Sequence, residues 1–148
     1  MDGAGSVAPG AGVLLVAIWD PIFFPGGPGD IHACGFAYSG APRFMAHCHC
    51  ESCRRATASP FNSFIGVPDG QWRWTGETPA DFASSPGVIR SFCAHCGSQI
   101  AFRADRFTGE IHYYAALLGD PGHFRPMGHV HTDEMLPWLH LCDDLPRT

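Results

Sequence analysis

The chain has 148 residues, a formal net charge of -5, 16% charged residues and 45% hydrophobic residues. This length and composition predict one globular domain that buries a real hydrophobic core. Because the balance of charge is acidic and no broad basic field exists, we expect neither nucleic acid nor a membrane surface as a partner.

The first 28 residues differ in composition from the rest of the chain. Gly, Ala and Pro dominate residues 1–12, and the apolar run GVLLVAIW follows at residues 12–19. The run is shorter than the ~20 residues that span a bilayer, and no Lys or Arg precedes it as in a secretory signal. We predict that residues 1–28 form an irregular appendage with one candidate strand. Without an export signal, we expect a cytoplasmic protein.

After Gly29 the sequence consists of short apolar or alternating runs that end at Gly, Pro, Asp or Ser. Such runs are typical of strands separated by turns, and no long helical periodicity accompanies them. We predict strands at residues 61–67, 71–76, 88–92, 98–104 and the start of 110–118. Only a turn or two of helix is expected, over residues 54–58. The domain at residues 29–146 is therefore predicted to be mainly β, with few short helices.

Six of the seven cysteines belong to three local groups, namely H-A-C at 32–34, C-H-C-E-S-C at 48–53 and C-A-H-C at 93–96. Alternate residues of a strand point to the same side, so His32 can face one point with Cys34, and Cys48 with Cys50. A C-x-x-C turn brings two sulfurs together in the same way. In a reducing compartment such clusters favour metal binding over disulfides, and the spacing indicates zinc.

The spacing leaves two partitions of the ligands open. In the first, a single closed zinc ribbon contains Cys50, Cys53, Cys93 and Cys96. In the second there are two sites: a four-ligand site of His32, Cys34, Cys93 and Cys96, and a three-ligand site of Cys48, Cys50 and Cys53 with an open fourth position.

The sequence between about Ile31 and Pro146 resembles the glutathione-dependent formaldehyde-activating enzymes, which share a domain with centromere protein V. The resemblance lies in AHCHCESCRRATASPF, GVPDGQWRWTGETP, FASSPGVIRSFCAHCGSQIAFR and LPWLHLCDDLPR. It implies a fold of small twisted antiparallel sheets around zinc, called a β-tent and similar to a zinc ribbon.

The resemblance also implies the two-site partition. Cys48, Cys50 and Cys53 would hold a catalytic zinc, and the ligands of a structural zinc would include Cys34, Cys93 and Cys96. The chain departs from the family in GDIHACG at 29–35, where His32 stands in place of the usual first cysteine. Either His32 ligates the structural zinc through a ring nitrogen, or this first motif is degenerate.

The function that the resemblance implies is that of a carbon–sulfur lyase with two Zn²⁺ per chain. A zinc with three thiolate ligands and an open position can hold glutathione as a thiolate, to which formaldehyde adds to give S-hydroxymethylglutathione. Other thiols and other small aldehydes remain candidate substrates. Arg54 and Arg55 are candidate ligands of a substrate carboxylate, with a solvated surface pair as the alternative.

Two other functions remain open. One is a non-enzymatic zinc module that binds another protein, and the other is a thiol redox protein that uses Cys93 and Cys96. Outside the ligand groups, we expect His47 and His49 to face away from the metal. We expect Cys142 to be a small buried residue.

Overall fold

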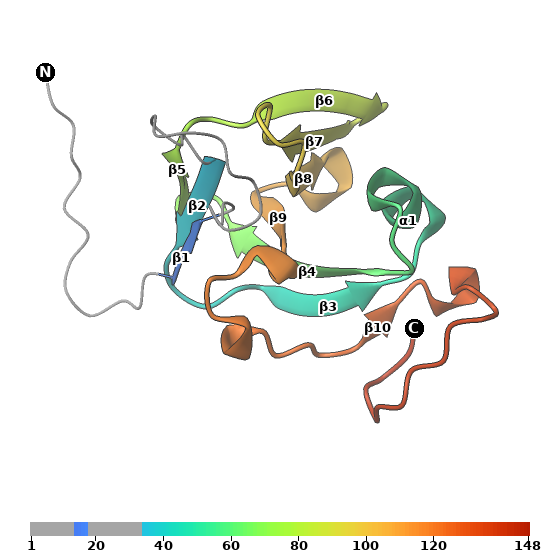
Figure 1. Cartoon of the computed structure of the whole chain (residues 1–148). Coiled ribbons are helices and arrows are strands. Elements are labelled where there is room, and N and C mark those ends of the chain that lie inside the picture. The colour runs from blue at the N-terminus through green and yellow to red at the C-terminus, as the bar shows by residue number, and fades with distance from the viewer. Residues whose placement is uncertain (1–13, 18–33) are drawn as a thin grey trace, which may run out of the picture.

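The computed structural model describes residues 14–17 and 34–148 (Figure 1). Within this part of the chain there are ten strands, one α-helix and four single turns of 3-10 helix, which confirms the prediction of a mainly β fold. The strands are β1 (Leu14–Ala17), β2 (Cys34–Tyr38), β3 (Phe44–Cys48), β4 (Asn62–Pro68), β5 (Trp72–Gly76), β6 (Ala80–Ser85), β7 (Val88–Phe92), β8 (Gln99–Ala104), β9 (Glu110–Tyr114) and β10 (His129–Val130). The helices are α1 (Glu51–Thr57), η1 (Asp105–Phe107), η2 (Ala115–Leu117), η3 (Pro121–His123) and η4 (Thr132–Glu134).

The strands form two sheets. One has three strands in the order β1-β2-β5, and the other has seven in the order β10-β3-β4-β9-β8-β7-β6. The paired strands run antiparallel except for β10, which pairs with β3 in parallel. In Figure 1 the three-stranded sheet lies at the left, and α1 lies at the right beyond the end of β3.

The central strands of the large sheet are buried on both faces. On β4 the alternation of side chains directs Ile65 and Val67 to one face and Phe64 to the other, and all three are buried. The first face packs against the three-stranded sheet, where the ring of Phe36 stacks on Tyr113 with centroids 3.7 Å apart. This double burial explains why the sequence at 64–67 is a continuous apolar run.

The opposite face of the large sheet forms a second buried cluster with α1. Phe64, Phe102 and Tyr114 pack there with the cysteines of the segment that joins β3 to α1. The cysteine cluster is therefore part of the hydrophobic core.

The five predicted strands lie close to β4, β5, β7, β8 and β9. β9 stops at Tyr114 because the chain turns into η2, and α1 begins at Glu51, three residues earlier than predicted. Strands β2, β3, β6 and β10 were not among the predicted strands. Trp72 and Trp74 are half-buried against the core, as expected.

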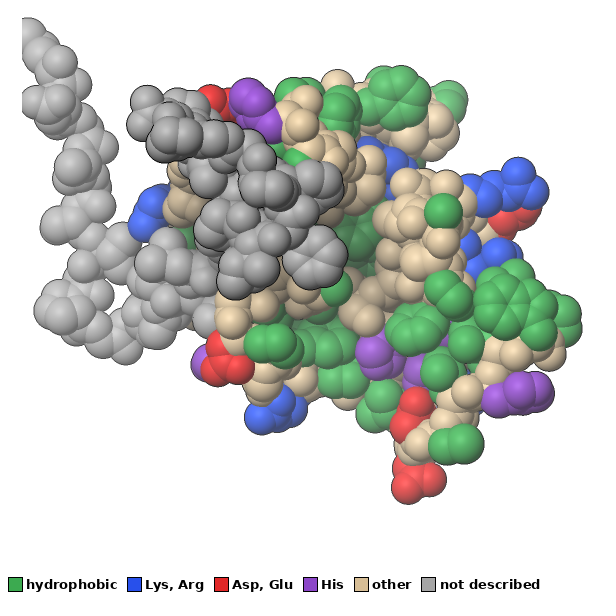
Figure 2. Space-filling model, in the orientation of Figure 1, with side chains coloured by type: hydrophobic (Ala, Val, Ile, Leu, Met, Phe, Trp, Pro, Cys, Tyr) green, Lys and Arg blue, Asp and Glu red, His purple; other side chains and the backbone are tan. Residues whose placement is uncertain are grey.

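The described surface carries both charged and apolar side chains, with apolar ones gathered over the C-terminal segment at the lower right (Figure 2). Trp138 of this segment is 63% exposed. Among the helices of the described residues, none has the length and hydropathy that crossing a bilayer requires.

Candidate metal centre

Three cysteines converge where β3 passes into α1. The sulfur atoms of Cys48, Cys50 and Cys53 all lie within 4.8 Å of one another, and all three residues are buried. Cys48 ends β3, Cys50 is the N-cap residue of α1, and Cys53 lies in the first turn of the helix. The expectation that Cys50 continues a strand is therefore wrong: a strand end and a helix start bring the sulfurs together.

The N-terminus of α1 is held partly by these sulfurs. Sγ of Cys50 accepts a hydrogen bond from the backbone N–H of Cys53 over 3.4 Å. The backbone N–H of Glu51 donates to Oε2 of Glu134 over 2.6 Å. The two acceptors satisfy N–H groups that the first turn of a helix leaves without partners, so the C-terminal segment helps to fix the helix beside the cysteines.

The three thiols share protons among themselves. Hydrogen bonds from Cys48 and then Cys53 lower the pKa of Cys50. Donating to Cys50 and Cys53, together with burial, raises the pKa of Cys48. For Cys53, a hydrogen bond from Cys48 lowers the pKa, whereas the hydrogen bond to Cys50 and burial raise it. The net pKa of Cys53 is raised. Cys50 is thus the one thiol of the three whose pKa its surroundings lower.

This donor set suits Zn²⁺. Buried, convergent thiols are the ligands that zinc prefers, and a cation among them would favour loss of all three protons. Within the part of the chain that the structure describes, no fourth His, Cys, Asp or Glu side chain belongs to this group.

A second group of cysteines lies between the two sheets. Cys34 begins β2, while Cys93 and Cys96 belong to the turn between β7 and β8. The thiols of Cys34 and Cys96 both donate hydrogen bonds to Cys93. Cys96 is exposed, and its Sγ is 3.1 Å from Oγ of Ser98.

In this group, too, hydrogen bonds lower the pKa of one thiol, that of Cys93. Burial raises the pKa of Cys93, but hydrogen bonds from the backbone N–H of Cys96 and from the Cys34 thiol outweigh it and lower the pKa to about 7. Burial, and then the hydrogen bond to Cys93, raise the pKa of Cys34 to about 12. The turn closes through the N–H of Gly97, which donates to the carbonyl of Cys93 over 2.8 Å and has a φ of 77°. A C-x-x-C turn with backbone N–H groups on its first sulfur suits a structural zinc.

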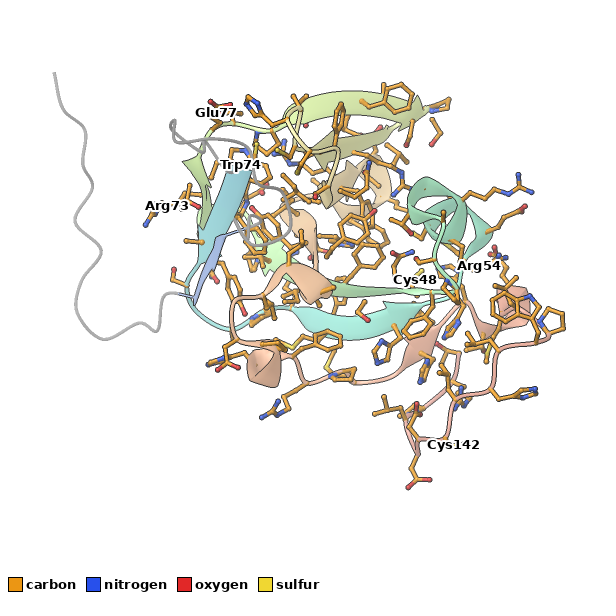
Figure 3. All side chains as sticks on the ribbon, viewed as in Figure 1. Cys48, Arg54, Arg73, Trp74, Glu77 and Cys142 are labelled. Carbon is orange, nitrogen blue, oxygen red and sulfur yellow. The ribbon has the colours of Figure 1, made fainter. Side chains whose placement is uncertain are left out.

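Six of the seven described cysteines therefore lie in two groups, and Cys142 lies outside both. Cys48 and Glu77, whose charge acts on Cys34, lie on opposite sides of the molecule in Figure 3. His32 lies outside the described residues, so its role as a ligand stays a prediction, as does the partition of zinc between the groups.

The two histidines that flank Cys48 hydrogen-bond away from the sulfurs. Nδ1 of His47 is 2.8 Å from Oγ of Ser63, and Nε2 of His49 is 2.8 Å from Nδ1 of His129. His129 in turn contacts Asp143 through its Nε2, at 3.1 Å. A chain of buried imidazoles thus connects the cysteine segment to the C-terminal segment.

The two arginines that follow Cys53 differ in their surroundings. Nε of Arg54 donates to the carbonyl of His49 over 2.9 Å, and its Nη2 donates to the carbonyl of Glu134. Arg54 therefore ties α1 to the C-terminal segment. Arg55 is exposed and forms an ion pair of 2.7 Å with Glu51, one turn earlier. Substrate binding by either arginine stays a prediction.

Arg90 on β7 is a buried cation near the cysteines that was not predicted from the sequence. Arg90 is 6% exposed. Its positive charge lowers the pKa of Cys53 and so opposes the net rise in that pKa. The available signal was its alternation with Val88 and Phe92, which places a charge on an otherwise apolar face.

Cys142 does not have the predicted environment. It is exposed on the C-terminal segment, far from Cys48 in Figure 3, rather than buried. The segment from 138 onward has little regular structure, and its residues are exposed or half-buried, so its short apolar stretch gives no core position.

One of three comparisons with known proteins identifies a family for this chain. No curated protein matches the sequence. A crystal structure of a Rhodobacter sphaeroides protein is similar over 58% of this chain and 80% of that chain, with 15% identity and a TM-score of 0.48, a likeness too weak to support an argument. A family model described as glutathione-dependent formaldehyde-activating enzyme matches residues 32–134, which include the cysteines of both groups. The chain belongs to the family of glutathione-dependent formaldehyde-activating enzymes.

Proposed function

We propose that the protein is a zinc-dependent carbon–sulfur lyase that joins a small aldehyde to a thiol, with formaldehyde and glutathione as the substrates that its family suggests. The observation that carries the proposal is the group of three buried sulfurs within 4.8 Å of one another, without a fourth protein donor among the described residues. Three protein ligands and one open position are typical of a catalytic zinc site.

Cys48, Cys50 and Cys53 would hold the ion. A zinc ion bound there would supply the positive charge that keeps a substrate thiol deprotonated. In the overall reaction the S–H bond breaks, a carbon–sulfur bond forms and the carbonyl oxygen gains the proton, so no net acid or base is consumed. The chain surrounds the sulfurs with apolar side chains, because Phe64, Phe102 and Tyr114 belong to the same buried cluster.

A second zinc would be structural, held by Cys34, Cys93 and Cys96 with His32 as the proposed fourth ligand. The proposal includes a cytoplasmic location and two Zn²⁺ per chain.

The test combines metal analysis with a direct assay of the adduct. We expect two zinc ions per chain by elemental analysis, and faster exchange between glutathione and S-hydroxymethylglutathione by NMR. Cys50→Ser should lose one zinc and the rate enhancement while the fold persists, because serine is a favoured N-cap residue for α1. Cys142→Ser, which alters an exposed thiol outside both groups, is the matched control and should change neither quantity.

The outcomes separate the candidate functions. Exchange rates that are equal with and without protein would remove the lyase proposal, and two bound zinc ions would then favour a binding module. A protein without zinc that oxidises reversibly at Cys93 and Cys96 would instead favour the redox function.

A further inference from the structure

A cavity of about 560 Å³ opens to solvent between α1 and the strands β6, β7 and β8. Its volume lies in the range that small-molecule sites occupy. The lining residues include Ser52, Arg55 and Ala56 of α1 and Phe82, Arg90 and Phe92 of the strands. No cysteine is among the described residues that line it, so a molecule in this cavity would not reach the sulfurs of the metal centre.

Arg90 is a buried cation of this cavity without an ion pair. It is 6% exposed, and none of the ion pairs among the described residues includes it. A buried charge is costly unless an opposite charge compensates it. The guanidinium donates only to neutral acceptors: Nη1 to the hydroxyl of Tyr114 over 3.3 Å, and Nη2 to Oγ of Ser52 over 3.1 Å and to its carbonyl over 3.5 Å. At least two of its five N–H groups are therefore left for another acceptor.

Two aromatic rings flank Arg90 on the cavity side of the sheet. Phe82 on β6 lies directly opposite Arg90 in the strand register, so the two side chains project from the same face. Phe92 follows Arg90 by two residues on β7 and shares this face as well. Phe82 is 62% exposed, so an apolar group in the cavity would remove part of its ring from water. The cavity thus places an apolar surface on both sides of one cation.

The other charges of the cavity limit the charge of its ligand. Arg55 lines the cavity from the exposed side of α1, but it forms an ion pair of 2.7 Å with Glu51. No acidic side chain is among the lining residues that the structure describes. Arg90 is therefore the cation of this cavity that lacks a counterion, and one carboxylate would supply it.

We propose that this cavity is a second ligand site, separate from the metal centre, which binds a small monocarboxylate with an aromatic or aliphatic body. The carboxylate accepts hydrogen bonds from the remaining N–H groups of Arg90, and the body lies against Phe82 and Phe92. A guanidinium and a carboxylate match in geometry as well as in charge. The site goes beyond the proposed function and does not depend on it, because its ligand carries no thiol and takes no part in the reaction.

The test compares two ligands that differ only in charge. Calorimetric titration of the zinc-loaded full chain with 3-phenylpropionate is compared with titration by 3-phenylpropionamide, which has the same body and is neutral. We expect the amide to bind about ten- to hundredfold more weakly, the effect of losing charge-assisted hydrogen bonds. Equal affinities of acid and amide would overturn the inference, and this comparison does not depend on the folding of any variant.

Three variants locate the ligand. Phe82→Ser removes an exposed ring from an edge strand and should weaken binding of the acid roughly fivefold. In Arg90→Gln the acid and the amide should bind equally. Arg73→Gln alters an exposed arginine on the side of the molecule opposite α1 in Figure 3, and it should preserve the parent affinities.

Two results would place the acid elsewhere. A carboxylate bound directly to zinc would not respond to Phe82, so an affinity for the acid that is equal in Phe82→Ser and the parent would overturn the inference. Reduced glutathione at saturating concentration should leave the affinity for 3-phenylpropionate unchanged, and displacement of the acid would overturn the separate role of the cavity. The proposed function fails separately, since an absence of exchange activity alters none of these affinities.

Discussion

His112 on β9 is a buried histidine remote from both cysteine groups. Its ring lies among those of Phe44, Phe102 and Phe107, and its Nε2 is 2.7 Å from Oε1 of Glu110. Burial lowers the pKa of His112 from 6.5, and Glu110 opposes the lowering only in part. The folded protein therefore keeps His112 neutral at pH values where the unfolded chain protonates it.

This difference makes stability depend on pH. Above pH 6.5 neither state binds the proton, and the contribution of neutral His112 is fully present. As the pH falls below 6.5, His112 becomes protonated in the unfolded chain but stays neutral in the folded protein. The free energy of unfolding therefore decreases. Between pH 7 and pH 5 we expect the free energy of unfolding to fall less in His112→Gln than in the parent. Urea denaturation at each pH measures it.

Any metal that acid releases would leave both proteins alike, so its effect would cancel in the comparison. His140→Gln, at an exposed histidine, controls for the loss of one imidazole. A slope against pH that is equal in His112→Gln and in the parent would contradict the prediction.

Individual residues could be predicted where their spacing alone limits their geometry. Cys48, Cys50 and Cys53 lie so close in sequence that one change of backbone direction, from the end of β3 into α1, is enough to bring their sulfurs together. Alternation on β7 places Arg90 on an apolar face, but its partners Ser52 and Tyr114 are distant in sequence and no local pattern reveals them. The exposure of Cys142 also depends on distant segments.

At the scale of elements, Gly66 on β4 lies opposite Phe44 on β3 in the strand register. The ring of Phe44 lies across Gly66, and a Cβ atom at this position would meet three ring carbons inside contact distance. The glycine is therefore required by close approach of a side chain, rather than by its backbone angles.

We expect Gly66→Ala to destabilise the fold by about 1–3 kcal/mol, because the Phe44 ring must leave its place against His112. Chemical denaturation measures the change. In Phe44→Leu the additional cost of Gly66→Ala should be smaller, since a shorter side chain clears the added methyl group. An equal cost in both backgrounds would show that overpacking by Phe44 is not the cause.

Elements with a strong hydrophobic pattern could be predicted, and those without one could not. The limits of β7 were predicted correctly because VIRSF follows a Pro-Gly turn. Strand β6 is an exposed edge with the sequence ADFASS, and it is ordered by its pairing with β7 rather than by its own apolar pattern. The two residues of β10 are ordered by β3 in the same way.

At the scale of the whole molecule, the second cysteine group lies between the two sheets. Cys34 begins a strand of the small sheet and Cys93 follows a strand of the large one. Nε2 of His95 and Oε2 of Glu77 add a contact of 2.5 Å beside them. A metal bound to this group would therefore join the two sheets.

For this reason we expect Cys93→Ser to lose one zinc and at least ~3 kcal/mol of stability, a fall in melting temperature on the order of 10 °C. Cys50→Ser, which leaves the link between the sheets intact, should lower the melting temperature less. Scanning calorimetry compares the melting temperatures of the two variants, and parallel metal analysis counts the zinc that each has lost. A greater loss in Cys50→Ser would show that the metal beside α1 supports the fold more than the metal between the sheets.

For the overall arrangement, the sequence predicts only the fold class, a mainly β domain, and not the order of the strands. Strand content and turns follow from local chemistry, but the order β10-β3-β4-β9-β8-β7-β6 depends on contacts between distant segments. The position of α1 beside β7, which creates the cavity at Arg90, is a product of that order.

The exposure of Cys142 has a practical consequence. With both cysteine groups coordinated, it would be the one thiol available to a maleimide dye, giving a fluorophore in one-to-one stoichiometry on the C-terminal segment. Since this segment contacts α1 through Glu134, such a dye would follow the C-terminal segment without touching the sulfurs that the chemistry needs.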